Sequence, residues 1–253
     1  MTMAWNSCYL AIGLLSLCFA SPTQAFVVPR SPAVAARAAL LILESTAASE
    51  YDIPIADAKV ILNKAVATKA EDPNEVIAAL ESLEKLMRQK VKIEGESAAQ
   101  EVLNCLDGHW RLVFTTGTAK TQQNMGRINY FPLKAVQSFE TKEMQISNGI
   151  YVGEFCLIKF FGTFEFDLKK RKLEFDFDLI KLLGILNIPL KQGDAAQLGA
   201  STGLGSKSNV ENAKRDKQAF FNWISADDTI ATARGGGGGL ALWQRTEDPG
   251  VQR

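Results

Sequence analysis

Apolar residues recur every three to four positions in the first part of the chain, which is the period of an amphipathic helix. The clearest helix is predicted to begin at Asp72, a good N-cap residue, with Pro73 at its first helical position. Its buried stripe is expected to comprise Val76, Ile77, Leu80, Leu83 and Met87. Two more helices are predicted over residues 55–68 and 97–105. The pattern thus predicts a small helical region, residues 44–105, that packs against the following chain or against a partner.

From residue 106 the period changes to two, which is typical of half-buried strands. The stretch GHWRLVFTT places Trp110, Leu112 and Phe114 on one face of the first predicted strand. Further strands are predicted in KAVQSFET, IYVGEFCLIKF, AFFNWIS, DTIATAR and GLALWQR. Many short strands with turn signals between them favour an antiparallel sandwich or barrel. The expected fold class is mainly β, or α+β overall, with a sheet over residues 106–246 and a tail over 247–253.

The strongest alternation, GTFEFDLKKRKLEFDFDL, lies on both sides of a predicted Lys-Arg turn. Pairing Leu168 with Leu173 gathers one aromatic wall, formed by Phe164, Phe166, Phe175 and Phe177. The opposite face is acidic, and this pairing sets Asp167 against Glu174, a destabilising contact. A nearby lysine is expected to compensate: Lys159, Lys169 or Lys172. We interpret the acidic face as solvated rather than metal-binding, because a flat strand face does not wrap an ion.

Three segments around the last strands need separate interpretation. The apolar stretch IKLLGILNIPL, residues 180–190, is expected to close one end of the core, or else to form a flap that touches lipid. The polar segment 192–217 is expected to be a long functional or mobile loop. The five glycines 235–239 stand between two predicted strands and predict a hairpin turn at the sheet rim. Replacing Gly235 and Gly239 is expected to lower thermal stability.

The N-terminal residues have the features of a targeting signal. The first 25 residues carry no charged side chain and are apolar from Tyr9 to Ala20, which is typical of a signal peptide. A transmembrane anchor, the alternative, needs about 20 uninterrupted apolar residues. Residues 26–43 are alanine-rich, basic and free of acidic residues, as in a transit peptide. This combination resembles the two-part address of algae with complex plastids, so a plastid location is expected, with secretion as the alternative.

The charge balance of the chain restricts the binding partners that we expect. The chain of 253 residues has 28 basic and 28 acidic side chains, so no overall charge draws it to nucleic acid or to an anionic membrane. Lipid contact is therefore expected to be apolar and local.

Without the predicted signal peptide, Cys105 and Cys156 are the cysteines that remain. Two unpaired thiols are favoured over one disulfide between them.

Motifs for catalysis are scarce. The single histidine, His109, stands beside Trp110 without a nucleophile motif, and no GxSxG, HExxH or CxxC occurs. The stretch GLGSKS lacks the Gly-Lys step of a phosphate loop, and the glycine run precedes a strand where a dinucleotide fold needs a helix. We therefore expect no enzyme activity, no cofactor and no metal site.

Two segments resemble a known family. LDGHWRLVFTTGT and FFNWISADDTIATARGGGGGLALWQR are similar to the plastid lipid-associated proteins, also called plastid fibrillins, over about residues 106–245. The resemblance implies a lipocalin-like barrel in which Gly108 and Trp110 correspond to the Gly-x-Trp of the first strand. It further implies that Arg245 or Arg234 lies over this tryptophan. The structural motif of the family is thus expected to include Gly108, Trp110, Arg234, Gly235, Gly239 and Arg245.

The resemblance implies a non-enzymatic, lipid-binding protein associated with thylakoids or plastoglobules. Its barrel is expected to hold an isoprenoid, a pigment or an acyl chain, for example a quinone or a carotenoid, or to contact a membrane or lipid-droplet surface. The predicted apolar wall comprises Leu112, Phe114, Phe164, Phe166, Phe175 and Phe177. The alternative is a scaffolding protein that has no ligand cavity and docks a protein partner through its helical region. In that case the barrel is expected to stay folded without residues 45–101.

Overall fold

The computed structural model describes most of the chain after its N-terminal segment. The described residues are 32–118, 122–123, 126–191, 193–201, 210–211, 213–214 and 217–250. The predicted signal peptide, residues 1–25, and residues 26–31 of the predicted transit segment lie outside these ranges. The chain divides into two compact units, residues 1–42 and 43–253, and the packing described below belongs to the second unit.

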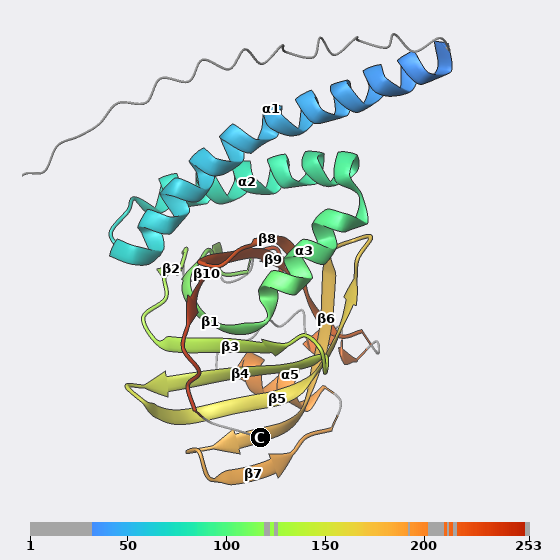
Figure 1. Cartoon of the computed structure of the whole chain (residues 1–253). Helices are drawn as coiled ribbons and strands as arrows, with labels where there is room; N and C mark the ends of the chain where they lie inside the picture. Colours follow the sequence, from blue (N-terminus) through green and yellow to red (C-terminus); the bar gives the residue numbers. More distant parts are fainter. Residues whose placement is uncertain are drawn as a thin grey trace, which may run out of the picture. The chain divides into compact units, whose positions relative to one another are not determined.

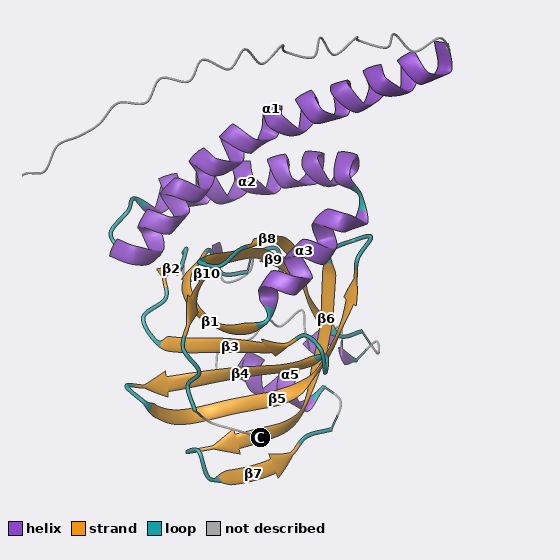
Figure 2. Cartoon of the chain, in the orientation of Figure 1, coloured by secondary structure: helices purple, strands orange, loops and turns teal. Residues whose placement is uncertain are grey.

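Three helices precede the sheet (Figure 1 and Figure 2). They are α1 (Pro32–Thr68), α2 (Pro73–Glu94) and α3 (Glu96–Leu106). At the start of α2 the Asp72 carboxylate accepts the backbone N–H of Asn74 at 2.8 Å, and the whole predicted stripe is buried. The N-cap and the buried face of α2 are therefore confirmed. Helix α1 ends at the predicted residue, Thr68, but begins before residue 55 and contains Pro54.

The strands pair antiparallel and the sheet closes on itself. The strands are β1 (Gly108–Thr115), β2 (Asn129–Tyr130), β3 (Lys134–Glu140), β4 (Gln145–Val152), β5 (Phe155–Asp167), β6 (Lys172–Leu182), β7 (Leu186–Pro189), β8 (Ala219–Ala226), β9 (Ile230–Gly235) and β10 (Leu240–Thr246). The barrel runs β1, β3, β4, β5, β6, β8, β9, β10 and closes because β10 pairs with β1. Strand β2 adds to β1, and β7 adds to β6. This arrangement confirms the mainly β, lipocalin-like barrel preceded by helices.

Buried apolar side chains form an outer core and an inner core. The outer core lies between the helices and the outer face of the barrel, and includes Leu62, Leu80, Leu83, Phe114, Ile224, Ile230 and Leu242. The inner core lies inside the barrel, and includes Leu106, Trp110, Phe139, Phe164, Leu173, Trp223 and Trp243. The helical region therefore packs against the following chain, which is the first of the two predicted alternatives.

Two ion pairs join the helices to the barrel beside the outer core. Arg234 of β9 donates to Glu84 of α2, with Nη2 2.6 Å from Oε2 and Nε 3.0 Å from Oε1. Lys59 Nζ of α1 lies 2.8 Å from Asp227 Oδ2. Burial by itself raises the pKa of Asp227, but hydrogen bonds from Lys59 and from the backbone of the β8–β9 turn outweigh it and lower this pKa to about 2. The Asp227 carboxylate is therefore charged at neutral pH and forms an ion pair with Lys59.

Strand β1 departs from strict alternation next to Val113. Its register with β10 shifts between Leu112 and Phe114, so that the strand carries a β-bulge. The bulge turns Phe114 to the outer face, where it is fully buried in the outer core. The prediction that Phe114 shares a face with Trp110 and Leu112 is therefore wrong.

The β5–β6 hairpin has a longer turn than predicted. Leu173 pairs with Phe166, and the predicted pairing with Leu168 is wrong. The physical reason lies at Arg171, which adopts a left-handed conformation (φ 50°). Its buried guanidinium turns back to donate to the Ile224 carbonyl oxygen at 2.9 Å, which keeps residues 168–171 out of the ladder.

This register rearranges the acidic face of the hairpin. Asp167 pairs with Lys172, so the predicted contact between Asp167 and Glu174 does not form. Glu165 and Glu174 are opposed instead. Lys172 Nζ lies 2.6 Å from Glu174 Oε1 and offsets the repulsion, as expected for one of the three lysines named from the sequence.

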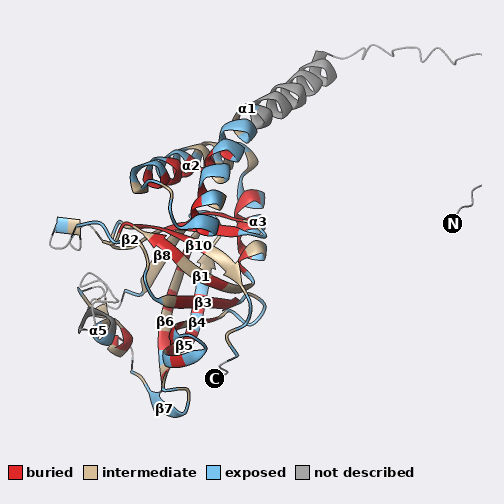
Figure 3. Ribbon diagram, turned by 90° about the vertical axis from the view of Figure 1, so that its left-hand side faces the viewer, coloured by how far each residue is buried: buried red, intermediate tan, exposed pale blue. Residues whose placement is uncertain are grey.

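The apolar stretch 180–190 does not close the core. Strand β6 takes its first part, and β7 forms an exposed hairpin with β6 (Figure 3). Ile185 at the turn is 84% exposed. The favoured prediction of core closure is therefore wrong for residues 183–189, which lie in the exposed hairpin, whereas Leu190 packs against the inner core.

The polar segment 192–217 is not a loop throughout. Helix α5 spans Asp194–Ser201, and Ala195 on this helix is buried against the inner core. The prediction of a long functional or mobile loop is therefore wrong in calling residues 194–201 a loop. Residues 192, 202–209, 212 and 215–216 of the segment lie outside the described residues.

Candidate functional site

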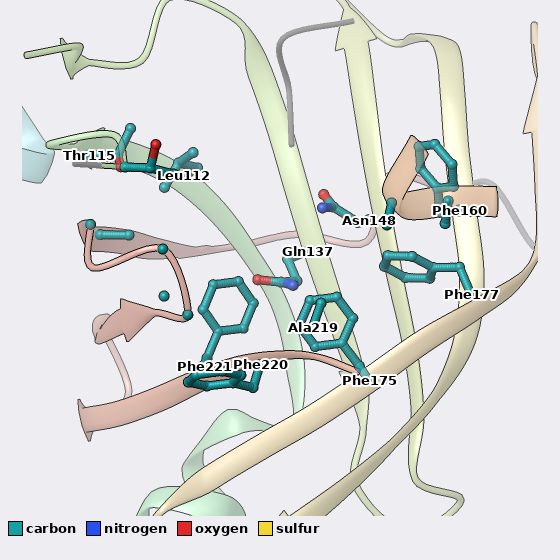
Figure 4. Close-up of a pocket in the computed structure, with 18 of the residues that line it drawn as sticks. Leu112, Thr115, Gln137, Asn148, Phe160, Phe175, Phe177, Ala219, Phe220 and Phe221 are labelled. Atoms are coloured by element: carbon teal, nitrogen blue, oxygen red, sulfur yellow. The ribbon is translucent and has the colours of Figure 1, made fainter. Parts of the chain in front are cut away.

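The barrel contains a partly open cavity of about 340 Å³ (Figure 4). Every strand of the barrel contributes to its wall, and α5 borders it. The wall is mainly apolar, with large side chains from Leu112, Phe160, Phe175, Phe177, Phe220, Phe221 and Trp243. A concave, mainly apolar cavity of this size is typical of small-molecule binding sites.

Aromatic rings of the wall support one another. Phe175 of β6 and Phe221 of β8 stack, with ring centroids 5.3 Å apart and planes inclined by 16°. Trp243 of β10 meets Phe221 edge-on, with the centroids 5.6 Å apart. Phe177 continues the row, with its ring centroid 5.4 Å from those of Phe175 and Phe160. These contacts hold the rings in defined orientations and present a rigid apolar surface to the cavity.

The six residues of the predicted apolar wall separate into three groups. Leu112, Phe175 and Phe177 line the cavity. Phe164 and Phe166 belong to the inner core and do not line it. Phe114 packs in the outer core because of the bulge in β1. The cavity residues that sequence reasoning missed include Phe160, Phe221 and Trp243, although alternation in AFFNWIS and GLALWQR could have indicated the last two.

Polar groups are few in the cavity wall. Gln137 of β3 and Asn148 of β4 are paired across the two strands, and both line the cavity. The Gln137 side chain is buried, and its Nε2 has no hydrogen-bond partner among the described residues. Asp176 also lines the cavity, and burial raises the pKa of its carboxyl group. Lys217 is exposed at the cavity border.

The glycine run forms one rim of the cavity. Gly235 and Gly239 end a tight turn between β9 and β10, in which Gly235 N–H donates to the Gly239 carbonyl at 2.9 Å. This confirms the predicted hairpin turn. A Cβ on Gly239 would lie 2.3 Å from the Gly117 carbonyl oxygen, so only glycine allows the chains to approach here. The run therefore shapes the rim with backbone alone.

Arg245 closes the barrel next to α3. Its guanidinium lies 4.3 Å from the ring centroid of Trp110 and donates to the Asp107 carbonyl oxygen at 2.8 Å. Gly108 leaves room for this group, because a Cβ there would lie 3.0 Å from Arg245 Nη1. Of the two arginines named from the sequence, Arg245 makes the contact with Trp110, whereas Arg234 binds α2.

The described residues assemble little catalytic chemistry. They contain no group of three or more His, Cys, Asp or Glu side chains that could hold a metal ion. His109 Nδ1 lies 2.8 Å from Ser138 Oγ, but Nε2 is 3.9 Å from Asp248, and none of the three lines the cavity. Cys105 and Cys156 are free thiols, as favoured from the sequence. The cavity thus offers binding surfaces rather than a positioned nucleophile.

A closed antiparallel barrel with an apolar interior is the architecture of lipocalin-like proteins. The PAP_fibrillin family model matches residues 53–242, so this chain belongs to the plastid lipid-associated protein (fibrillin) family. Members of this family are plastid-associated, lipid-associated and structural rather than enzymatic. The match begins in α1, which places the helical region inside the family domain.

No curated protein and no solved structure matches the chain. Among the residues that the structure describes, no helix is both long and apolar enough to span a membrane.

Proposed function

We propose that this protein is a non-enzymatic lipid carrier or lipid-holding protein of the plastid, at thylakoids or plastoglobules. Its barrel takes up the apolar part of an isoprenoid, a pigment or an acyl chain. The observation that carries the proposal is the apolar cavity of about 340 Å³ with its aromatic wall. A scaffolding protein without a ligand needs no such space, and side chains would fill its barrel. The targeting features of residues 1–43 support entry into a complex plastid.

A titration of the purified protein with a short-chain quinone or a carotenoid tests ligand uptake. We expect saturable quenching of tryptophan fluorescence, because Trp243 lies in the cavity wall. Ala196→Phe fills part of the cavity and is expected to weaken binding at least tenfold. Gln197→Phe is the matched control, since Gln197 is exposed on the same helix and does not line the cavity. Absence of saturable quenching, or equal loss in both variants, contradicts uptake by the cavity.

An exposed apolar tip supports contact with a lipid surface. It comprises Val152, Phe155, Leu157, Leu183, Ile185, Leu186 and Ile188, each of which is more than a third exposed. The β4–β5 and β6–β7 turns that carry it are neighbours, because Leu183 N–H donates to the Leu157 carbonyl oxygen at 2.9 Å. Patches of this kind mark interaction sites. We propose that the apolar tip inserts into the surface of a plastid membrane or lipid droplet.

Substitution of Phe155 and Ile185 by aspartate tests the apolar tip. We expect at least tenfold weaker co-flotation with uncharged galactolipid vesicles, because two large apolar side chains are lost and two charges must enter lipid. The melting temperature is expected to stay unchanged, since both side chains are exposed. Val60→Asp on α1, where Val60 is 67% exposed, is the control. Flotation that is unchanged in the tip variant, or lost equally in the control, argues against the tip.

A further inference from the structure

A buried side-chain amide whose nitrogen has no partner among the described residues lies in the wall of the apolar cavity. The side chain of Gln137 is 4% exposed, and Nε2 has no hydrogen-bond partner among the described residues. In Figure 4 the Gln137 side chain lies among the labelled wall residues, between Asn148 and the Phe221 ring. A buried donor left unsatisfied destabilises the free protein, so its position in a binding cavity calls for a ligand atom.

The strand pairing explains why the amide points inward. Gln137 occupies the same face of β3 as Ala135, and both residues line the cavity. Asn148, its cross-strand neighbour on β4, adds a second amide to the same place. Two adjacent amides can satisfy one ligand oxygen while the surrounding rings contact carbon atoms. Gln137 and Asn148 therefore form a paired amide position in a mainly apolar wall, which also includes the polar side chains of Thr115, Thr118, Asp176, Lys217 and Gln218.

The charges around the cavity oppose an anionic ligand. Asp176 lies in the wall, and burial raises the pKa of its carboxyl group, with a further contribution from Asp178 and Asp194 nearby. The cationic side chain among the described wall residues is Lys217, and it is exposed at the border. A carboxylate drawn in to Gln137 would lose its hydration without gaining a buried cation. An uncharged oxygen meets no such penalty.

We propose that the cavity selects an uncharged lipid with a carbonyl oxygen, such as the head of a quinone, and that Gln137 Nε2 donates a hydrogen bond to that oxygen. The aromatic wall holds the ring and the first part of the apolar chain. This inference rests on the proposed lipid-binding function and names its ligand class. It distinguishes quinone-like ligands from fatty acids, which carry a charge at neutral pH.

Calorimetric titration of the full chain with three matched probes tests the selection. The probes are heptyl-1,4-benzoquinone, heptylbenzene and 4-heptylbenzoate, which present a neutral carbonyl, no oxygen and a carboxylate. The wild-type protein is expected to bind the quinone most tightly and the benzoate least. Gln137→Leu is expected to weaken quinone binding about five- to tenfold, the value of one hydrogen bond, without weakening heptylbenzene binding. Gln145→Leu on β4 is the control, since Gln145 does not line the cavity.

The free proteins supply a second measurement. Gln137→Leu removes an unsatisfied buried amide, so its melting temperature without ligand is expected to rise. A fall in melting temperature with unchanged quinone affinity would show a structural amide and overturn the inference. Benzoate binding as tight as quinone binding overturns it too. If heptylbenzene and the quinone both fail to bind the wild-type protein, the proposed lipid-binding function itself is contradicted. This result differs from a failure of the ligand selection alone, in which the probes still bind.

Discussion

A chain that lacks residues 45–101 is expected to lose the cooperative unfolding transition of the barrel. Helices α1 and α2 cover the outer core, where Phe114, Ile230 and Leu242 are fully buried. Each large apolar side chain that returns to water costs about 1.5–3 kcal/mol. Several such side chains together approach the whole stability of a typical domain, about 5–15 kcal/mol. Scanning calorimetry and near-UV circular dichroism measure the loss.

This expectation replaces the earlier one that the barrel stays folded without its helices. Removal of residues 1–42 is the matched control and is expected to leave the transition unchanged, because these residues belong to a separate compact unit. A milder variant, Leu83→Ala, is expected to cost about 2–5 kcal/mol at a fully buried position. A deletion variant that still unfolds cooperatively near the wild-type temperature contradicts a shared core.

Gly239→Ala is expected to lower the melting temperature by about 5–10 °C. The added Cβ would lie 2.3 Å from the Gly117 carbonyl oxygen and 3.4 Å from the Thr118 nitrogen. Both neighbours are backbone atoms, so relief requires β10 to move away from the end of β1. The cost of such overpacking is about 1–3 kcal/mol or more, and each kcal/mol shifts the melting temperature of a domain this size by about 2–4 °C. Thermal unfolding monitored by circular dichroism measures the shift.

Gly235→Ala is the matched control at the other end of the same turn. A Cβ on Gly235 would have its nearest contact at 3.8 Å, which is ordinary van der Waals distance. Its effect is expected to stay within about 0.5 kcal/mol, as for substitutions away from strained positions. The structure thus separates two glycines that the sequence treated alike. Equal destabilisation by both variants would show that the whole run needs flexibility, and no effect of Gly239→Ala would contradict the close approach.

The helices and the strand content could be predicted because their signals are local. The cap at Asp72, the proline after it and the apolar stripe of α2 lie within a few turns of one another, so no distant residue has to be known. The period-two pattern likewise locates most of the strands. Alternation in the β5–β6 hairpin correctly predicted Phe175 and Phe177 as cavity residues, but it also predicted Phe164 and Phe166, which do not line the cavity. The contact between Trp110 and Arg245 was predicted from the family resemblance.

One error arose where an extra residue in a strand changed the face of the residues after it. The bulge beside Val113 moves Phe114 from the barrel interior to the outer core, and alternation alone cannot show it. The turn at Arg171 instead moves the hairpin register by two residues and leaves the faces as predicted, because the Ile224 carbonyl oxygen on β8 accepts a hydrogen bond from the arginine. Gln137 carries a weak signal, a glutamine in the apolar register of its strand. That signal has meaning once a cavity is known to lie beside it.

Local periodicity and turn chemistry were enough to predict the helical region, an antiparallel sandwich or barrel, and the glycine turn, and the ordered motifs pointed to the family and through it to the barrel. The tertiary structure decided which face of β1 carries Phe114, that the helices share a core with the barrel, and that an apolar cavity with one unsatisfied amide lies inside. These features depend on strand register and on contacts between residues far apart in the chain. Such contacts arise when the sheet closes, and no short stretch of sequence contains them.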